Sequence, residues 1–322
     1  MNYGNLIGDA LKITLRNRYL WFFGFFAGGT TGFNVPTNVP SGGGNFNLDD
    51  FQQSNTMLSA AQFGQGLGNG VIIAGLIVVA LIIALFFIFM AVVSQGALAD
   101  SVAAIDRGNR RGFGSAFRSG LGNFWRVLGY FVVFILIAIG LLLVIGIPVA
   151  LLIGGTFVAT QAVGARIAVA VVVGLVAVLA LIVVFVPLSI VGQYALREIV
   201  VRRERILGSV GSGYAIFRRN IGRSLLILLI QVGLSIGIAI AFLLAILIVG
   251  LVLALPAIAL AVAGSSTGVW IAGGIALLIF IPLFLVATGA IGTFSHAYWT
   301  LAYLRLTAAP PTPSPGSSPI PG

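Results

Sequence analysis

Apolar residues in this chain come in long unbroken runs rather than in short alternating patterns. A helix needs roughly 20 residues to cross about 30 Å of hydrocarbon. Five runs are longer than this, and they cover residues 71–93, 127–153, 167–191, 225–255 and 269–291. The strands of a membrane barrel would instead alternate lipid-facing and lumen-facing residues. The pattern therefore predicts an all-α fold, a polytopic transmembrane helical bundle.

Composition agrees with a membrane protein and narrows its chemistry. Hydrophobic residues make up 59% of the chain and charged residues only 7%, against about 25% charged residues in soluble domains. Cysteine is absent and there is one histidine, which excludes thiol catalysis and leaves little from which to build a metal site. We expect no cofactor. The net charge of +10 does not indicate nucleic-acid binding, because the cations flank the apolar runs, where lipid headgroups lie.

The distribution of Lys and Arg predicts how the chain is threaded. Residues 94–126 carry five Arg and residues 190–223 carry seven, whereas residues 30–70 carry no Lys or Arg. Because positively charged segments stay in the cytoplasm, residues 30–70 should form an outer loop, and the chain must cross the membrane once near residues 19–35. A cleaved signal peptide would give the same topology, but a Phe stands where cleavage needs a small residue. We expect six spans, the first one short, in a bacterial cytoplasmic membrane, with both termini cytoplasmic.

Similar sequences recur near the inner ends of the spans. Residues 87–90, 185–188 and 280–283 read Phe-Ile-Phe-Met, Phe-Val-Pro-Leu and Phe-Ile-Pro-Leu. The basic segments that precede two of the spans also match, since a Phe-Arg pair occurs at 117–118 and again at 217–218. Chance recurrence in apolar sequence of low complexity is the alternative. We interpret the pattern as three repeated two-span hairpins, each preceded by a cytoplasmic amphipathic helix.

The repeats define one membrane domain, residues 1–306. The units cover about residues 3–93, 111–191 and 208–292. The remaining residues, 307–322, contain six prolines and no apolar run, so we expect them to form a disordered tail.

Basic residues beside the spans are the candidate contacts for anionic lipid headgroups. A protein partner or a second copy of the chain is the alternative ligand for the same residues. The candidates are Lys12, Arg16, Arg18, Arg110, Arg111, Arg118, Arg126, Arg202, Arg203, Arg218, Arg219 and Arg223.

Strongly polar side chains are scarce inside the predicted spans, and the candidates are Gln231, Ser235 and Thr288. Residues 233–237, Gly-Leu-Ser-Ile-Gly, have the spacing of a hydrolase nucleophile elbow. That motif requires a strand–turn–helix context, whereas small residues in mid-span favour helix packing. The single histidine, His296, lies among aromatic residues past the last span, which predicts a position at headgroup level. We predict no catalytic and no metal-binding residues.

The residues that enter the first span carry a family resemblance. Residues 15–24 read Leu-Arg-Asn-Arg-Tyr-Leu-Trp-Phe-Phe-Gly and are followed later by Arg-rich helices. Together they resemble an uncharacterised bacterial family named for the membrane domain of glycerophosphoryl diester phosphodiesterases. The resemblance implies a six-span membrane module of unknown function. The phosphodiesterase domain itself, with its acidic and histidine metal ligands, has no counterpart here, so the resemblance implies no enzyme activity.

Two functions follow from these patterns. The first is a non-catalytic membrane module that binds anionic lipid or a partner protein through Arg-rich interfacial helices. The alternative is a passive or lipid-substrate transporter, favoured by the predicted repeat and by prolines that would kink the last four spans. No charged residue lies at the middle of a span, which weakens ion-coupled transport, because such residues usually mark ion pathways. The prolines are Pro148, Pro187, Pro256 and Pro282.

Overall fold

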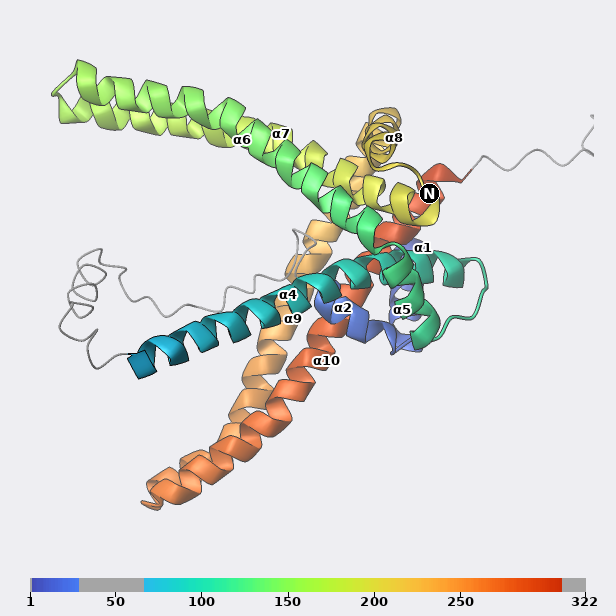
Figure 1. The fold of residues 1–322 in the computed structure, drawn as a ribbon, viewed down its shortest axis with the longest axis vertical. Coiled ribbons are helices and arrows are strands. Elements are labelled where there is room, and N and C mark those ends of the chain that lie inside the picture. Colours follow the sequence, from blue (N-terminus) through green and yellow to red (C-terminus); the bar gives the residue numbers. More distant parts are fainter. Residues whose placement is uncertain (1, 29–66, 309–322) are drawn as a thin grey trace, which may run out of the picture.

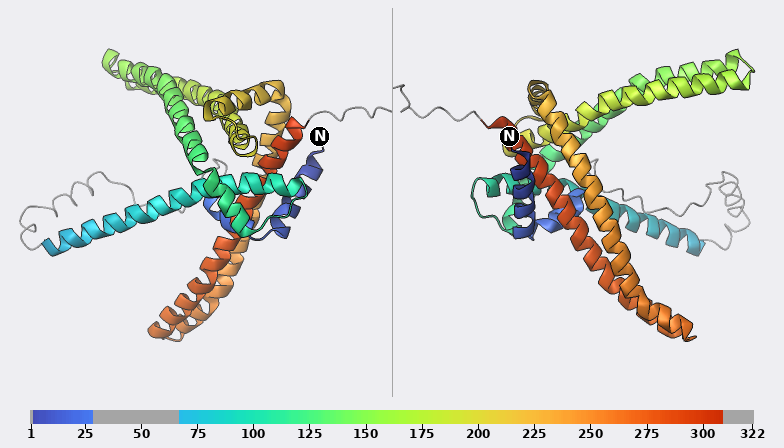
Figure 2. Two further views of the ribbon diagram at one scale, coloured as in Figure 1. Left: turned by 45° about the vertical axis from the view of Figure 1, so that its right-hand side comes forward. Right: turned by 180° about the vertical axis from the view of Figure 1, so that it is seen from behind.

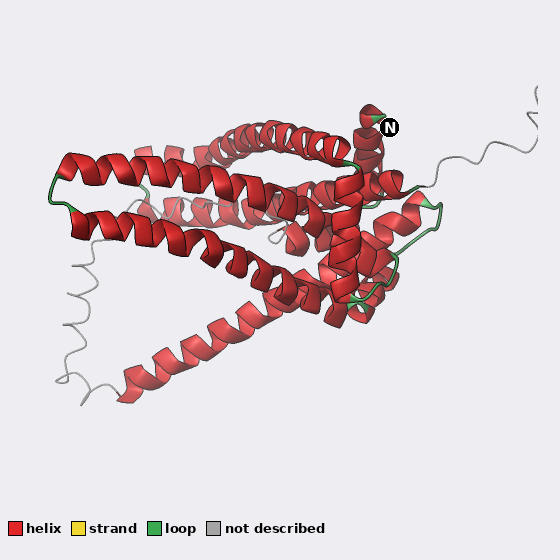
Figure 3. Cartoon of the chain, turned by 90° about the horizontal axis from the view of Figure 1, so that it is seen from above, coloured by secondary structure: helices red, strands yellow, loops and turns green. Residues whose placement is uncertain are grey.

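The structure is a computed structural model, and it describes residues 2–28 and 67–308 of the chain. Throughout these ranges the regular structure is helical and no strand occurs, which confirms the predicted all-α class (Figure 3). In chain order the helices are α1 (Tyr3–Arg16), α2 (Leu20–Gly28), α4 (Leu67–Asp106), α5 (Phe113–Gly122), α6 (Phe124–Ala159), α7 (Val163–Val201), α8 (Ile206–Arg219), α9 (Ile221–Val262) and α10 (Ser266–Thr307).

Five of these helices, α4, α6, α7, α9 and α10, are long and apolar enough to cross a membrane. They contain the five apolar runs, and large apolar side chains along them, such as Leu136 and Leu151, are more than half exposed. Such surfaces are stable only in contact with lipid. The prediction of a membrane-spanning helical protein is confirmed at this level.

Only part of the predicted first span lies within the described residues, and that part is helix α2. Helix α2 has nine residues and is therefore only about 14 Å long at 1.5 Å per residue. The rest of that span and most of the predicted outer loop, residues 29–66, lie outside the described residues, as do residues 309–322 of the predicted tail. Helix α4 begins at Leu67, inside the segment that the charge pattern assigned to the outer loop.

Three arms diverge from one compact hub (Figures 1 and 2). One arm is α4, the second is the α6–α7 hairpin and the third is the α9–α10 hairpin. The hub consists of α1, α2, α5, α8 and the last turns of α4, α7 and α10, which we define as residues 90–106, 190–201 and 289–307. Both described ends of the chain lie at the hub, where Arg305 of α10 forms an ion pair with Asp9 of α1.

The protein core is formed by the ends of α4, α7 and α10. Nearly every residue in 92–104, 190–200 and 292–303 is buried. The apolar runs end at residues 93, 191 and 291, but the three helices continue for about three further turns. Small residues such as Gly, Ala and Ser are frequent there, and they allow helix backbones to approach closely. The core therefore lies past the predicted spans. It is formed by segments that the charge pattern had assigned to the basic cytoplasmic side.

The short helices cover this core. Helix α5 packs on α4, α8 packs on α7, and α1 packs on α10. Each contact is made by one face of an amphipathic helix. Helix α1 buries Leu6, Ala10 and Ile13, while α8 buries Ser209, Gly213 and Phe217. The short helices thus seal the core without extending it into the arms.

Helices α2 and α10 cross in direct backbone contact. A Cβ atom built on Gly292 would overlap the carbonyl oxygen of Gly24, and one built on Gly289 would overlap that of Trp21. The Thr293 hydroxyl donates a hydrogen bond to the carbonyl of Leu20 (2.9 Å) across the same contact. Only glycine fits at this crossing, because the obstructing atoms belong to the backbone and cannot rotate away.

This crossing yields a stability prediction. The substitution Gly292→Ala should lower the thermal unfolding midpoint in detergent, because overpacking of this kind costs about 1–3 kcal/mol. Gly274→Ala is the matched control, since Gly274 lies on the same helix and has open space around its Cβ position. Equal midpoints for the two variants would contradict the described contact between α2 and α10.

Candidate functional site

The twelve cations predicted as lipid or partner contacts all lie on the hub or at its edge. They occupy α1, the α1–α2 connection, the α4–α5 connection, α5, the first turn of α6, the α7–α8 connection, α8 and the first turn of α9. All are exposed except Arg111, which is half-buried. The apolar arms therefore extend from a strongly basic end of the molecule.

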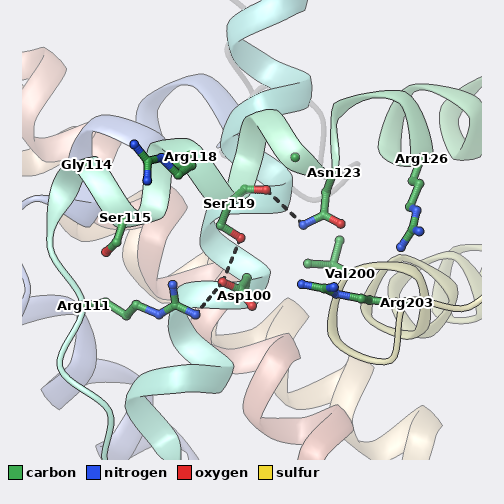
Figure 4. Close-up of a pocket in the computed structure, with 11 residues that line it drawn as sticks. Asp100, Arg111, Gly114, Ser115, Arg118, Ser119, Asn123, Arg126, Val200 and Arg203 are labelled. Carbon is green, nitrogen blue, oxygen red and sulfur yellow. Dashed lines mark hydrogen bonds and ion pairs between the residues drawn. The ribbon is translucent and has the colours of Figure 1, made fainter.

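Four of the twelve are brought together in one pocket of about 700 Å³ (Figure 4). Arg111 precedes α5, Arg118 lies on α5, Arg126 lies in the first turn of α6, and Arg203 follows α7. We call this the basic pocket. It is lined by Asp100, Arg111, Gly114, Ser115, Arg118, Ser119, Gly122, Asn123, Arg126, Val200 and Arg203.

One side of the basic pocket is fixed by polar contacts. The Arg111 Nη2 atom lies 3.1 Å from the Asp100 Oδ2 atom. The Ser119 hydroxyl donates to the same carboxylate oxygen at 2.8 Å, which ties α5 to α4. The Asn123 side-chain amide donates to the Ser119 carbonyl (3.0 Å) and joins the end of α5 to the start of α6. Arg111 is thereby held in place, since its partner carboxylate is itself held.

The other three guanidinium groups of the basic pocket, those of Arg118, Arg126 and Arg203, form no ion pair with any acid in the described part of the chain. Gly114 and Ser115 of the pocket wall belong to the first turn of α5, and Asn123 caps the start of α6. The exposed N–H groups of helix N-termini add positive potential. The pocket therefore has a positive potential, which favours anions.

Arg203 has an unusual backbone. Its φ angle of 57° is the only positive φ of a non-glycine residue within residues 2–28 and 67–308. The left-handed residue lies directly after the C-cap of α7, the position at which helices commonly end in this conformation, and the Glu204 N–H donates to the Glu198 carbonyl (3.3 Å) there. The turn between α7 and α8 places the Arg203 guanidinium group at the pocket.

Tyr19, between α1 and α2, lies near the same positive charge. Burial raises the pKa of the Tyr19 hydroxyl, and the charge of Arg111 acts in the opposite direction. The hydroxyl stays protonated at neutral pH, so it adds no negative charge beside the pocket.

The remaining predicted cations are distributed differently. Arg202 forms an ion pair with Glu198 (3.3 Å) and lies 6.0 Å from the centre of the Tyr303 ring, so it braces the end of α7. Lys12 and Arg16 line a smaller cavity of about 330 Å³ that also contains two acids. The other cations are exposed on the hub surface.

The predicted intramembrane polar residues serve packing. The Gln231 amide nitrogen donates to the Ser295 hydroxyl (3.1 Å) and to the Ser235 hydroxyl (3.4 Å). The bond to Ser295 ties α9 to α10, and the bond to Ser235 lies within α9 and brings Gln231 and Ser235 together. The Thr288 hydroxyl bonds only to carbonyls of its own helix and is not part of this group.

The His296 side chain is not exposed to lipid headgroups, and its predicted position at headgroup level stays a prediction. The side chain is fully buried in the hub core, because α10 continues beyond its apolar run and packs against α2 there. No cluster of three or more His, Asp or Glu side chains suited to a metal ion occurs in the part of the chain that the structure describes.

Sequence reasoning missed a buried arginine, Arg197. The side chain is fully buried. Its Nη1 atom donates to the Gln193 backbone carbonyl (2.8 Å) and its Nε atom to the Thr300 hydroxyl (3.4 Å). The available signal was position, because Arg197 lies one helical turn after Gln193 among apolar residues and therefore faces the same neighbours. The charge count placed it with the surface arginines instead.

Comparison with known proteins gives a family without an assigned activity. Residues 19–309 match a family described as a family of unknown function, DUF7544. No curated protein and no solved structure matches the chain. The findings thus support membership of an uncharacterised family and give no support to the resemblance to phosphodiesterase-associated membrane domains. Because the match covers most of its length, the chain belongs to the family of unknown function DUF7544.

Proposed function

We propose that the protein is a non-catalytic module of the bacterial cytoplasmic membrane that binds anionic lipid headgroups through arginines on its hub. One observation carries the proposal. Exposed Arg side chains gather at the end of the molecule from which the apolar arms extend. Arginines at that level contact lipid phosphates. A partner protein with an acidic surface is the alternative ligand for the same side chains.

The orientation and the repeat belong to this proposal. The hub is cytoplasmic by the positive-inside rule, which places both termini in the cytoplasm and makes α2 the start of the first of six spans. The packing of the short helices supports a threefold repeat, since α5 packs on α4 and α8 on α7. Helix α1 has no long helix before it and packs on α10, which closes the set into a ring.

Helix α8 supports the contact with lipid. Its buried face is turned toward α7, while Leu207 and Tyr214 are 76% and 55% exposed. Arg218 follows on the same outer face at the i, i+7, i+11 spacing, and Arg219 lies beside it. An exposed helical face that combines large apolar side chains with arginines is typical of a helix in the membrane interface.

A lateral cleft favours a second candidate function, a lipid-substrate transporter. The cleft has a volume of about 380 Å³ between α6 and α7, with Trp299 of α10 at one end. Its walls run from Tyr130 to Ala138 along α6, and it contains the polar side chains of Ser189 and Gln193. A cleft of this kind admits an acyl chain from the bilayer.

Transport of lipid is measurable in proteoliposomes. If the cleft carries lipid between leaflets, the protein accelerates transbilayer movement of a fluorescent phospholipid, and Ser189→Phe slows it by filling the cleft. A wild-type rate equal to that of protein-free vesicles would eliminate this second function. The binding module requires no such movement.

The topology is testable by cysteine accessibility, because the natural chain contains no cysteine. Single variants Asn45→Cys and Arg203→Cys should react with a membrane-impermeant thiol reagent from opposite sides of the membrane. Reaction of both from the same side would refute the six-span arrangement. Unlabelled wild-type protein is the background control.

Lipid binding is tested with the triple variant R218Q/R219Q/R223Q. Each cation near an anionic surface contributes about 1 kcal/mol, so the affinity for phosphatidylglycerol, measured by native mass spectrometry in detergent, should fall at least about tenfold. R218K/R219K/R223K keeps the charges and should bind nearly as the wild type. Unchanged binding by the Gln variant would argue against α8 and the first turn of α9 as a lipid contact.

A further inference from the structure

We propose that the basic pocket is a specific site for a terminal phosphate or a diphosphate, an anion that carries about two or more negative charges. The inference deepens the proposed function, since it names the headgroup chemistry that this part of the hub selects. The source of the phosphate is either a lipid headgroup or a soluble phosphorylated molecule.

The charge of the pocket sets the charge of its ligand. Four guanidinium groups and one carboxylate give the pocket a formal net charge of about +3. A phosphodiester carries one negative charge and would leave most of the positive charge of the pocket unneutralised. A phosphomonoester carries about −1.5 to −2 at pH 7, and a diphosphate carries more.

The geometry is suited to phosphate oxygens. A guanidinium group presents parallel N–H donors that bind two oxygens at once. Arg111 is already oriented by Asp100 and Ser119, and Arg203 is presented by its left-handed backbone. Arg118 and Arg126 extend from two further helix segments (Figure 4). Because guanidinium groups from four segments line this one pocket, they offer the oxygens of one terminal phosphate paired donors that the surface of a uniform bilayer lacks.

The floor of the pocket is closed. Beneath Val200, residues of α4, α6 and α7 pack into a buried layer that includes Val92, Val127 and Leu196. A ligand therefore enters from the hub side or laterally and does not pass into the arms. The volume of about 700 Å³ exceeds that of a phosphate group and lies in the usual range for ligand sites, so the pocket also accommodates part of the attached molecule.

The pocket rim favours a lipid. In the sequence, Leu121 and Trp125 neighbour the pocket residues Gly122 and Arg126, and they are 42% and 77% exposed. An exposed tryptophan at the start of a membrane helix anchors it at headgroup level, which is where a lipid phosphate lies.

The experiment compares three probes on the full-length protein in detergent, by native mass spectrometry and by thermal shift. The probes are dioleoyl phosphatidic acid, which bears a phosphomonoester, dioleoyl phosphatidylglycerol, which bears a phosphodiester, and inorganic diphosphate. The wild type should bind phosphatidic acid at least about tenfold more tightly than phosphatidylglycerol. This preference should weaken as the pH falls below about 6, where the second proton returns to the phosphomonoester.

The variant R118Q/R126Q/R203Q should lose the preference while it still binds phosphatidylglycerol. The variant R118K/R126K/R203K keeps the charge without the paired donors, so it should retain only part of the preference for phosphatidic acid. Competition by inorganic diphosphate would identify a soluble source of phosphate, and its absence a lipid source; either result supports the site. No preference in the wild type, or a preference that survives R118Q/R126Q/R203Q, would overturn the inference.

The two proposals fail separately. The variant R218Q/R219Q/R223Q should weaken the binding of phosphatidic acid and of phosphatidylglycerol equally. The preference for phosphatidic acid should remain. If that variant has no effect while the preference depends on the basic pocket, the general lipid contact fails and the specific site stands.

Discussion

The packing of three helix ends against one another is the constraint on which the rest of this structure depends. In a bilayer the apolar arms gain nothing by burying more apolar surface, since lipid tails are as apolar as leucine. Association must come from close backbone contact and polar bonds, and both are concentrated in the hub. The glycine crossing of α2 with α10 supplies the first. The second is supplied by bonds between long helices, such as Tyr194 with Ser224 (3.0 Å) and Tyr298 with the Ile227 carbonyl (2.9 Å).

The same physics explains which parts of the fold the sequence predicts. Five long helices follow from five apolar runs, because only a helix satisfies its own backbone in hydrocarbon. The core does not follow, because it lies where the runs stop and where Ser, Gly, Ala and Tyr are mixed. His296 shows the difficulty: its aromatic neighbours indicate the membrane interface, yet α10 carries it into the packed hub. Helix α2 is a further case, since its position depends on contact with residues 270 positions later.

The residues of the candidate site were predictable from the sequence, but the fact that they share one pocket was not. Charge alone identified Arg111, Arg118, Arg126 and Arg203 among twelve candidate cations. Nothing in their spacing indicates that they share one pocket, because Arg203 is brought there by the packing of α7 against α6. The ion pairs show the same limit. The loop before α5 brings Arg111 to Asp100 of α4, a pair that no helical spacing predicts.

The basic pocket links parts of the hub that belong to different arms. Asp100 lies on α4, Arg126 belongs to α6, and Arg203 follows α7. An anion bound there contacts all three and screens the repulsion among guanidinium groups that the fold holds close together. Such a ligand stabilises the packed hub relative to any arrangement in which the arms separate, by an amount set by its difference in affinity for the two states.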